Sequence, residues 1–328
     1  MESILVAGGA GYVGSHACKA LALAGYQPVT LDNLATGHAD AVKWGPYVQA
    51  DIRDADTVRR TLREHQITAV MHFAASSLVG ESMTKPGLYY ENNVIATLRF
   101  LEALTAEGVR QIVFSSTAAV YGAAEAELIP ESAPLKPTNT YGETKRVIEG
   151  ALSWMAPVHG FSWAALRYFN AAGADEAAEI GERHDPETHL IPNLVRATLG
   201  TGPSLKVFGT DYPTPDGSCL RDYIHVADLA EAHLAALTWL RAGPAGQGRA
   251  FNLGTGKGLS VLEIVAAGER VLGKTPPHEF AGRRAGDPPR LVADPSAAQT
   301  AFNWVARRSD ADTLIRTAAA FEKARAAN

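Results

Sequence analysis

Short apolar runs alternate with amphipathic stretches over the first half of the chain. The apolar runs, rich in Val, Ile, Phe and Ala, lie at residues 3–9, 28–33, 47–51, 69–75, 111–116 and 163–170. Helical patterns lie between them, at residues 12–25, 54–66, 88–108 and 141–155. Apolar strands without polar alternation, spaced by helices, are typical of a parallel sheet covered on both faces. We therefore predict an α/β fold built on a doubly wound parallel sheet.

The pattern loosens after about residue 171. A polar stretch at 173–189 indicates a loop, and residues 225–243 predict a long helix. The last helix is expected to begin after a cap at Ser309. We predict one domain over residues 1–170 and a smaller C-terminal α/β substrate domain over 171–328. Segments of the second domain, such as 222–240, are expected to pack back on the first.

Composition and charge exclude several classes of binding partner. The chain has 328 residues and a formal net charge of -5, which argues against a nucleic-acid or anionic-membrane surface. Its two cysteines, Cys18 and Cys219, lie far apart and do not suggest a disulfide framework. No apolar stretch approaches the ~20 residues that a membrane helix needs. We expect a cytoplasmic protein with neither nucleic-acid nor membrane partners.

The first strand runs into a glycine-rich turn. Gly8, Gly11 and Gly14 lie between this strand and the first helix, and Asp32 ends the second strand. Glycine lets the backbone N–H groups approach a pyrophosphate at the helix N-terminus, although a tight turn uses glycine without any ligand. A carboxylate after the second strand accepts hydrogen bonds from ribose hydroxyls and repels a 2′-phosphate. The pattern predicts a Rossmann-type domain that binds NAD rather than NADP.

Tyr141 and Lys145 are candidate catalytic groups. They lie four residues apart at the start of a predicted helix and so share one face, as do many exposed pairs. A nearby ammonium and a bound nicotinamidium would both lower the pKa of a tyrosine, which is ordinarily about 10. Ser115 and Thr117 follow an apolar strand, where parallel sheets build their sites. Together these residues predict a phenolate base, its cationic partner and a bridging hydroxyl.

The chain resembles the UDP-glucose (UDP-galactose) 4-epimerases of the extended short-chain dehydrogenase/reductase family. The resemblance covers nearly the whole chain and includes GGAGYVGSH, YYENNV, FSSTAAVYG, YGETK, LRYFN and RRAGD; its most specific part is the block 208–230. Ala7 stands where the family's glycine motif usually has Thr. The resemblance implies tightly held NAD, a 4-keto sugar intermediate and no net redox change. It also implies a UDP-sugar substrate and a homodimer.

The resemblance carries roles onto individual positions. It implies that Thr117, Tyr141 and Lys145 are catalytic. The matches for NAD binding are Gly8, Gly11, Tyr12, Val13, Gly14, Asp32, Asn33, Asp51, Ile52, Phe73, Ala74, Ala75, Asn92, Ser115, Tyr141, Lys145 and Tyr168. The matches for the UDP-sugar are Thr117, Phe169, Asn170, His189, Leu190, Phe208, Arg221, Arg284, Asp287 and Leu291. Arg221 and Arg284 suit a pyrophosphate, because guanidinium pairs with phosphate bidentately.

Three positions depart from the family pattern. Ser77 stands where many members have Lys near the cofactor, and His189 replaces an Asn that faces the phosphates. Leu291 stands where a bulky Tyr excludes N-acetyl sugars and a small residue admits them. Leucine is intermediate in size, so three substrate classes stay open: hexoses, N-acetylhexosamines and pentoses such as UDP-xylose/UDP-arabinose.

Two other activities are disfavoured by the residues present. Dehydratases of this fold usually carry acidic or hydroxyl groups just after the Thr, whereas this chain has Ala118 and Ala119. A non-catalytic NAD sensor would not need the Tyr141–Lys145 pair. The histidines show no ligand spacing, so no metal is expected, and the segment with His184, Asp185 and His189 is interpreted as a solvated loop.

The expected homodimer would pack through the helices at 92–107 and 141–155. Phe100, Leu101, Leu104 and Trp154 extend the apolar surface of these helices beyond one stripe. Those side chains are equally compatible with core packing.

Overall fold

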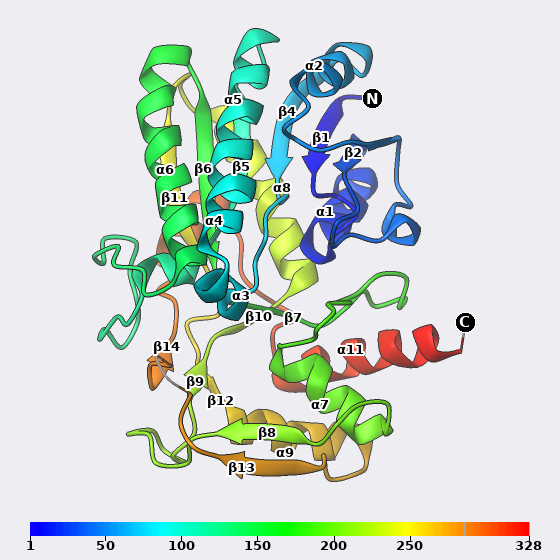
Figure 1. The fold of residues 1–328 in the computed structure, drawn as a ribbon, viewed down its shortest axis with the longest axis vertical. Coiled ribbons are helices and arrows are strands. Elements are labelled where there is room, and N and C mark those ends of the chain that lie inside the picture. Colours follow the sequence, from blue (N-terminus) through cyan, green and yellow to red (C-terminus); the bar gives the residue numbers. More distant parts are fainter. Residues whose placement is uncertain (285–286, 328) are drawn as a thin grey trace.

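A seven-stranded parallel sheet forms the upper part of the molecule in the computed structural model, which describes residues 1–284 and 287–327 (Figure 1). The strand order is β3-β2-β1-β4-β5-β6-β11, the order of a Rossmann sheet with a seventh strand added. Every neighbouring pair is parallel. The strands are β1 (Ser3–Ala7), β2 (Gln27–Asp32), β3 (Tyr47–Gln49), β4 (Ile67–His72), β5 (Gln111–Thr117), β6 (Ser162–Tyr168) and β11 (Gly248–Leu253). The predicted α/β class and parallel sheet are confirmed.

Helices cover both faces of this sheet, which explains why its strands are apolar throughout. Leu5 and Ala7 of β1 pack into a core shared with α2, α5 and α6. Ile4 and Val6 point to the other face and pack with α1, α8 and α10. These helices are α1 (Tyr12–Leu23), α2 (Ala55–Glu64), α5 (Ala96–Ala106), α6 (Thr140–His159), α8 (Val226–Ala242) and α10 (Ser296–Phe302).

The C-terminal half of the chain thus returns to the upper part. Helix α8 packs against α1 and against β5 and β6, and β11 pairs with β6 in register from Gly248↔Trp163 to Leu253↔Tyr168. The division of the chain into two domains at residue 170 remains a prediction. The chain passes between the upper and lower parts several times.

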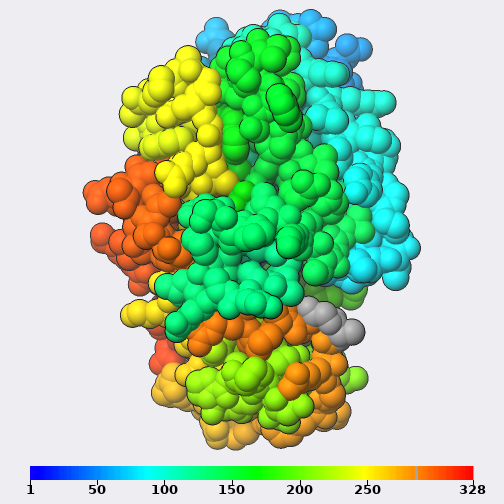
Figure 2. All heavy atoms as spheres, turned by 90° about the vertical axis from the view of Figure 1, so that its left-hand side faces the viewer, coloured from blue at the N-terminus to red at the C-terminus, as the bar shows by residue number. Residues whose placement is uncertain are grey.

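The lower part is a smaller α/β assembly around its own core. Its strands form the pairs β7 (Asn170–Ala172) with β10 (Tyr223–His225) and β8 (Leu205–Phe208) with β13 (His278–Ala281), and the sheet β12 (Leu259–Ser260), β9 (Leu220–Arg221) and β14 (Arg290–Leu291). The core lies between β8 and the helices α7 (Leu190–Leu199), α9 (Val261–Leu272) and α11 (Ala311–Ala326). The loop between Tyr121 and Thr140 lies over the junction of the two parts (Figure 2), and Ile129 N–H donates to Val292 O at 2.9 Å.

Short elements complete the upper part, and one replaces part of a predicted helix. They are η1 (Ala39–Ala41), α3 (Val79–Thr84), α4 (Pro86–Tyr89), η2 (Tyr90–Ile95) and η3 (Ala118–Tyr121). The helical pattern at 88–108 is a π-helical turn, η2, followed by α5. The side chains of Asn92 and Asn93 from this turn donate to Ser76, so the extra residue aims polar groups toward the end of β4.

The predicted cap of the last helix is wrong by one residue. Asp310, not Ser309, is the N-cap of α11, and its carboxylate accepts from Thr313 N–H at 2.9 Å. Ser309 is buried, accepts from His225 N–H and donates to Asp228. A carboxylate caps as well as a hydroxyl, and the buried Asp228 requires a donor.

The described helices include none that is long and apolar enough to cross a bilayer. Of the residues named for a dimer face, Phe100, Leu101 and Leu104 are buried in the monomer core, whereas Trp154 is 79% exposed.

Candidate active site and cofactor cleft

One cavity of about 1750 Å³ lies between the two parts, at the carboxyl ends of the sheet strands. Every residue that the sequence analysis assigned to catalysis, cofactor or substrate lines this cavity. They are Gly8, Gly11, Tyr12, Val13, Gly14, Asp32, Asn33, Asp51, Ile52, Phe73, Ala74, Ala75, Asn92, Ser115, Thr117, Tyr141, Lys145, Tyr168, Phe169, Asn170, His189, Leu190, Phe208, Arg221, Arg284, Asp287 and Leu291. Residues from ten or more segments of the chain therefore face one space.

The glycine turn is packed too closely for side chains. Gly8 has φ +84°, and a Cβ at this position would lie 2.6 Å from Ala74 N. A Cβ on Gly14 would lie 2.1 Å from Gly8 O. Helix α1 starts directly after this turn without a side-chain cap, so its first N–H groups are available to an anion. The turn fits a dinucleotide pyrophosphate.

The end of β2 supplies the carboxylate expected beside an adenosine ribose. Asp32 accepts from Ala10 N–H at 3.0 Å and from Leu34 N–H at 2.8 Å. Burial raises the pKa of Asp32, and those two bonds offset part of the rise. Asn33 Nδ2 donates to Asp51 Oδ2 at 2.8 Å, so these two predicted NAD-binding residues form one polar edge.

Tyr141 is fixed at the start of α6 by two local features. Asn139 caps the helix by accepting from Gly142 N–H at 2.8 Å. A Cβ on Gly142 would lie 2.4 Å from Ala119 O, so only glycine lets the helix approach η3 this closely. This approach places the Tyr141 phenol within hydrogen-bonding reach of Thr117, as predicted for a base and its bridging hydroxyl.

The electrostatics of the pair differ from the sequence-based expectation. Lys145 Nζ donates to Ser115 O at 2.8 Å and lies 5.9 Å from the centre of the Tyr141 ring. Burial raises the pKa of Tyr141 to about 12, although the bond to Thr117 lowers it in part. Burial lowers the pKa of Lys145 to about 7, and Glu149 opposes that change. Without cofactor, burial outweighs the bond to Thr117, and the phenol is protonated at neutral pH.

A buried ionic network behind β5 was missed by the sequence analysis. Arg167 pairs with Glu149 at 2.5 Å, and both side chains are 6% exposed. Ser116 Oγ donates to Glu149, and Arg167 also donates to Tyr121, which in turn donates to Asn252. The network ties β5, α6, β6 and β11 together directly behind Ser115 and Thr117. Its signal in the sequence was an arginine inside an apolar run.

The lower part contributes cations on the opposite side. Arg221 of β9 lies beside Leu291 in the register of β9 and β14, and its Nη2 atom is 3.6 Å from Asp287 Oδ1. The Arg284 guanidinium lies 4.5 Å from the centre of the Phe208 ring. Arg221, one of the two predicted diphosphate ligands, is therefore a neighbour of Leu291, the predicted sugar-pocket residue.

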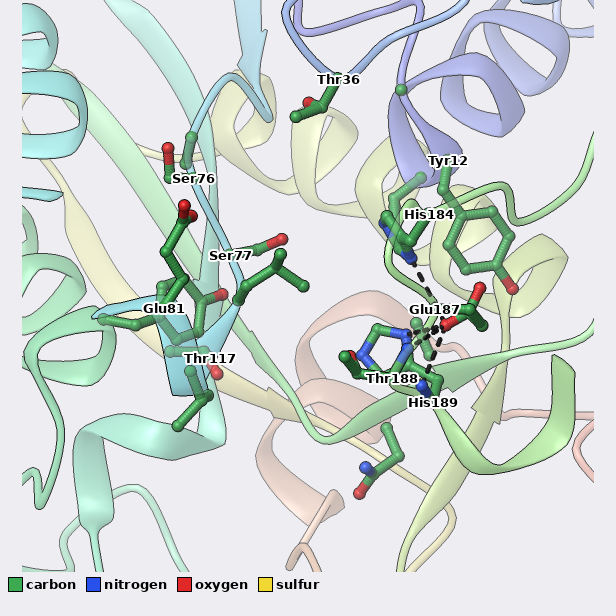
Figure 3. Close-up of a pocket in the computed structure, with 18 of the residues that line it drawn as sticks. Tyr12, Thr36, Ser76, Ser77, Glu81, Thr117, His184, Glu187, Thr188 and His189 are labelled. Atoms are coloured by element: carbon green, nitrogen blue, oxygen red, sulfur yellow. Dashed lines mark hydrogen bonds and ion pairs between the residues drawn. The ribbon is translucent and has the colours of Figure 1, made fainter. Parts of the chain in front are cut away.

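Polar groups line the cavity between these walls. Tyr168 and Ser115 share a hydrogen bond, and Asn92 Nδ2 donates to Ser76 Oγ at 3.1 Å. Ser77 lies on the same wall as Thr117, across from His184 and His189 (Figure 3).

The segment interpreted as a solvated loop is a loop in which Asp185, Thr188 and His189 are exposed, but it also holds two buried carboxylates. The side chains of Glu182 and Glu187 are 5% and 2% exposed, and His184 and His189 lie against them. Burial raises the pKa of Glu182, but His189 and His184 together outweigh this effect and lower it to about 2. Polar composition predicted exposure, which holds for Asp185 and His189, whereas the side chains of Glu182 and Glu187 are buried against the two histidines. The spacing E-x-H-x-x-E-x-H was the signal in the sequence.

Comparison with known proteins places the chain among relatives of full length. The NAD dependent epimerase/dehydratase family matches residues 4–254. A UDP-glucose 4-epimerase from Halalkalibacterium halodurans is 48% identical over 316 residues, which are 96% of this chain and 94% of that protein. The sequence-based resemblance to these epimerases is confirmed.

Solved structures agree with these matches. A UDP-glucose 4-epimerase from Brucella ovis in complex with NAD is 48% identical, with a TM-score of 0.94 over 97% of this chain and 98% of its own. A UDP-glucose-4-epimerase from Stenotrophomonas maltophila with bound NAD and formylated UDP-arabinopyranose is 39% identical, with a TM-score of 0.96 over 100% and 99%. The glycine turn, the parallel sheet and these full-length matches lead to one assignment. The chain belongs to the NAD dependent epimerase/dehydratase family.

Proposed function

We propose that the protein inverts C4 of a UDP-sugar of the UDP-glucose/UDP-galactose type, with NAD as its resident cofactor. The observation that carries this proposal is the placement of Tyr141 and Thr117 in the same cavity as the glycine turn. Curated relatives at 43–48% identity are named UDP-glucose 4-epimerases, which supports the reaction class.

The residues present fit the cofactor. Gly8 and Gly14 leave a cradle that a Cβ would fill, and the N-terminus of α1 points its N–H groups toward it. Asp32 would accept from the adenosine ribose, and Tyr168 and Lys145 would border the nicotinamide end. NAD⁺, when bound, supplies a reversible hydride acceptor and a positive charge near the phenol.

The proposed reaction assigns one role to each catalytic side chain. Tyr141 takes the proton from the sugar 4-hydroxyl, and Thr117 orients that hydroxyl by hydrogen bonding. The C4–H bond breaks with loss of a hydride as the C4–O bond becomes a carbonyl. Return of the hydride to the other face of C4 restores the hydroxyl with inverted configuration. The same tyrosine returns the proton, and because the hydride also returns to C4, no net oxidation occurs.

The diphosphate would be held on the opposite wall while the sugar turns. Arg221 and Arg284 are the proposed phosphate ligands, with Phe208 and Asp287 beside them. Binding energy from the UDP half then positions a sugar that has few fixed contacts of its own.

The intermediate size of Leu291 supports a second candidate function, the epimerisation of UDP-N-acetylhexosamines or of UDP-pentoses. Leu291 packs with Ala118, Val120 and Ile129, next to η3. The structure of one relative contains a bound formylated UDP-arabinopyranose, so a UDP-pentose is a specific substrate to test.

A dehydratase is a weaker candidate. Ala118 and Ala119 follow Thr117 in η3, and their methyl groups cannot transfer the protons that elimination needs. A non-catalytic NAD sensor is also a weaker candidate, because such sensors tend to lose the Tyr141–Lys145 pair, which is present in this chain.

We further propose that the protein acts in the cytoplasm as a homodimer. Trp154 and Val158 on α6 are 79% and 74% exposed, and Tyr90 and Ile95 on η2 are 41% and 39% exposed. Exposed aromatic and aliphatic groups on adjacent helices are typical of an interface. Light scattering of purified protein would report twice the chain mass of 34.8 kDa.

The proposed activity is tested with purified protein and no added cofactor. UDP-galactose, UDP-N-acetylgalactosamine and UDP-arabinopyranose are incubated separately, and C4 inversion is followed by proton NMR. Conversion of at least one sugar is expected, together with NAD released on denaturation. Absence of conversion for all three, with NAD supplied, would overturn the proposal.

A further inference from the structure

The segment between β7 and α7 brings four potential metal ligands into one cluster. One donor atom each from Glu182, His184, Glu187 and His189 lies within 4.8 Å of all the others. Figure 3 shows His184, Glu187 and His189 turned toward one another beside Tyr12, across the cavity from Thr117. None of these side chains has a part in the proposed proton transfer.

The spacing of the donor atoms suits a four-coordinate ion. His184 Nδ1 lies 2.9 Å from Glu182 Oε1 and 4.0 Å from Glu187 Oε1. His189 Nδ1 lies 3.6 Å from Glu187 Oε1 and also contacts Glu182. A tetrahedral Zn²⁺ with bonds of about 2.0–2.1 Å separates its ligand atoms by about 3.4 Å. Small side-chain adjustments would bring all four donors to that geometry.

Glu187 provides a second, independent observation. Its side chain is 2% exposed, and its Oε1 atom accepts from the N–H groups of Thr188 and His189. Its Oε2 atom is buried with no hydrogen-bond partner among the described residues. A buried carboxylate oxygen without a partner is costly, because it has lost water and gained nothing in return.

The charge of the cluster is also unbalanced. In the described part of the chain, Glu182 and Glu187 have no Lys or Arg within ion-pair distance, only the two histidines. Both carboxylates lie close to a cavity proposed to hold two anionic ligands. A divalent cation held by two neutral imidazoles would cancel both negative charges.

We propose that segment 182–189 binds one divalent transition-metal ion of the Zn²⁺ class, through Glu182, His184, Glu187 and His189. Two imidazoles select Zn²⁺-like ions over Mg²⁺ or Ca²⁺, which prefer oxygen ligands alone. The ion is structural. It lies where the segment crosses the start of α1, since the Tyr12 ring meets the His184 ring edge-on at 6.4 Å.

The ion would hold the wall that leads into α7. His189 is the residue before α7, and Asn193 of this helix donates to Glu187 O at 3.3 Å. Arg183 within the segment pairs with Asp40 of the upper part at 2.7 Å. Binding of the ion would therefore fix the segment against both parts of the molecule.

Calorimetric titration of ZnCl₂ into tag-free, chelator-stripped protein tests the proposal. We expect one ion per chain, no comparable heat with MgCl₂, and a Co²⁺ adduct with the intense visible absorption of a four-coordinate site. His184→Ala and Glu187→Gln should each weaken Zn²⁺ binding by at least about 100-fold, more than the loss of an outer-shell partner costs. His159→Ala, at an exposed histidine at the end of α6, is the matched control and should bind like the unaltered protein.

The outcomes are separable from the proposed enzymatic function, because binding is measured without substrate or turnover. Absence of stoichiometric Zn²⁺ binding in the unaltered protein would overturn the metal site and leave the epimerase proposal standing. A Zn²⁺ affinity in both cluster variants equal to that of the unaltered protein would also overturn the metal site. That result would support a metal-free His189–Glu182 ion pair. Glu187→Gln keeps the side-chain shape, so it decides the test if His184→Ala fails to fold by circular dichroism.

Discussion

The two walls of the cavity are built in different ways. On the sheet side, Ser115, Thr117 and Lys145 are 6%, 9% and 2% exposed and lie on β5 and α6, backed by the Glu149–Arg167 pair. On the opposite side, His189 is 48% exposed at its side chain, and Arg284 lies on an exposed loop. The groups proposed to move protons are buried, whereas the groups proposed to hold the nucleotide lie on more exposed segments. Catalysis requires the first arrangement and a turning sugar requires the second.

Replacing the base should have the largest effect. Tyr141→Phe removes the hydroxyl that accepts the proton, so kcat should fall by about 10²–10⁴-fold, the usual contribution of a positioned acid or base. Stopped NMR assays of C4 inversion measure the loss. Tyr90→Phe, on an exposed tyrosine of η2, should leave kcat unchanged. Activity within about twofold of the unaltered protein in Tyr141→Phe would remove the phenol from the mechanism.

A stability comparison tests whether the walls differ in rigidity. Arg167→Met leaves Glu149 buried without its cation and should lower the free energy of unfolding by about 3–5 kcal/mol. Arg183→Met breaks a pair with Asp40, which is 74% exposed, and should cost less than about 1 kcal/mol. Urea denaturation followed by tryptophan fluorescence compares the two variants. Equal losses in the free energy of unfolding would contradict a difference in rigidity between the two walls.

The pKa of Tyr141 should depend on the charge of the cofactor. Burial raises it to about 12 in the cofactor-free protein. The positive ring of NAD⁺ should lower it by about 1–3 pH units, as an adjacent opposite charge does for other acids. The phenolate fraction, and with it kcat/KM, therefore rises with pH toward that lowered pKa.

Ultraviolet difference titration of the NAD⁺-loaded and NADH-loaded protein, with Tyr141→Phe subtracted, measures this shift. NADH has a neutral ring, so the tyrosine should titrate at higher pH in that form. The same midpoint in both forms would show that the cofactor charge does not act on the phenol.

The smallest effect is expected at Leu291, on the adaptable wall. Leu291→Ala should raise kcat/KM for UDP-N-acetylgalactosamine relative to UDP-galactose by about 10-fold, since a few methyl groups in a pocket discriminate to that extent. Leu291→Tyr should shift the ratio in the opposite direction. Parallel NMR assays with both sugars give the ratio directly, and an unchanged ratio in both variants would move the specificity determinant elsewhere.

The sequence predicted the sheet side of the molecule better than the other side. Apolar runs such as Gln111–Thr117 are buried on both faces, and the glycines at 8, 11 and 14 meet specific backbone constraints, so local pattern was sufficient there. The Glu149–Arg167 pair was missed because its two members are 18 residues apart on different elements. In segment 182–189 the exposure of Asp185 and His189 was predicted correctly, whereas the burial of Glu182 and Glu187 depends on tertiary contacts that no local pattern encodes. Ser309 and Asp310 are both good caps, and only the buried Asp228 decides between them.

The origin of the seventh strand has a consequence during synthesis on the ribosome. When residue 170 has emerged, β6 is the last strand available, and its outer edge has no partner until residues 248–253 follow. An unpaired apolar edge is prone to join other chains. Roughly 80 further residues take about 4–16 s to add at 5–20 residues per second. The nascent chain therefore spends several seconds with its largest sheet open, which is the interval in which a chaperone would protect it.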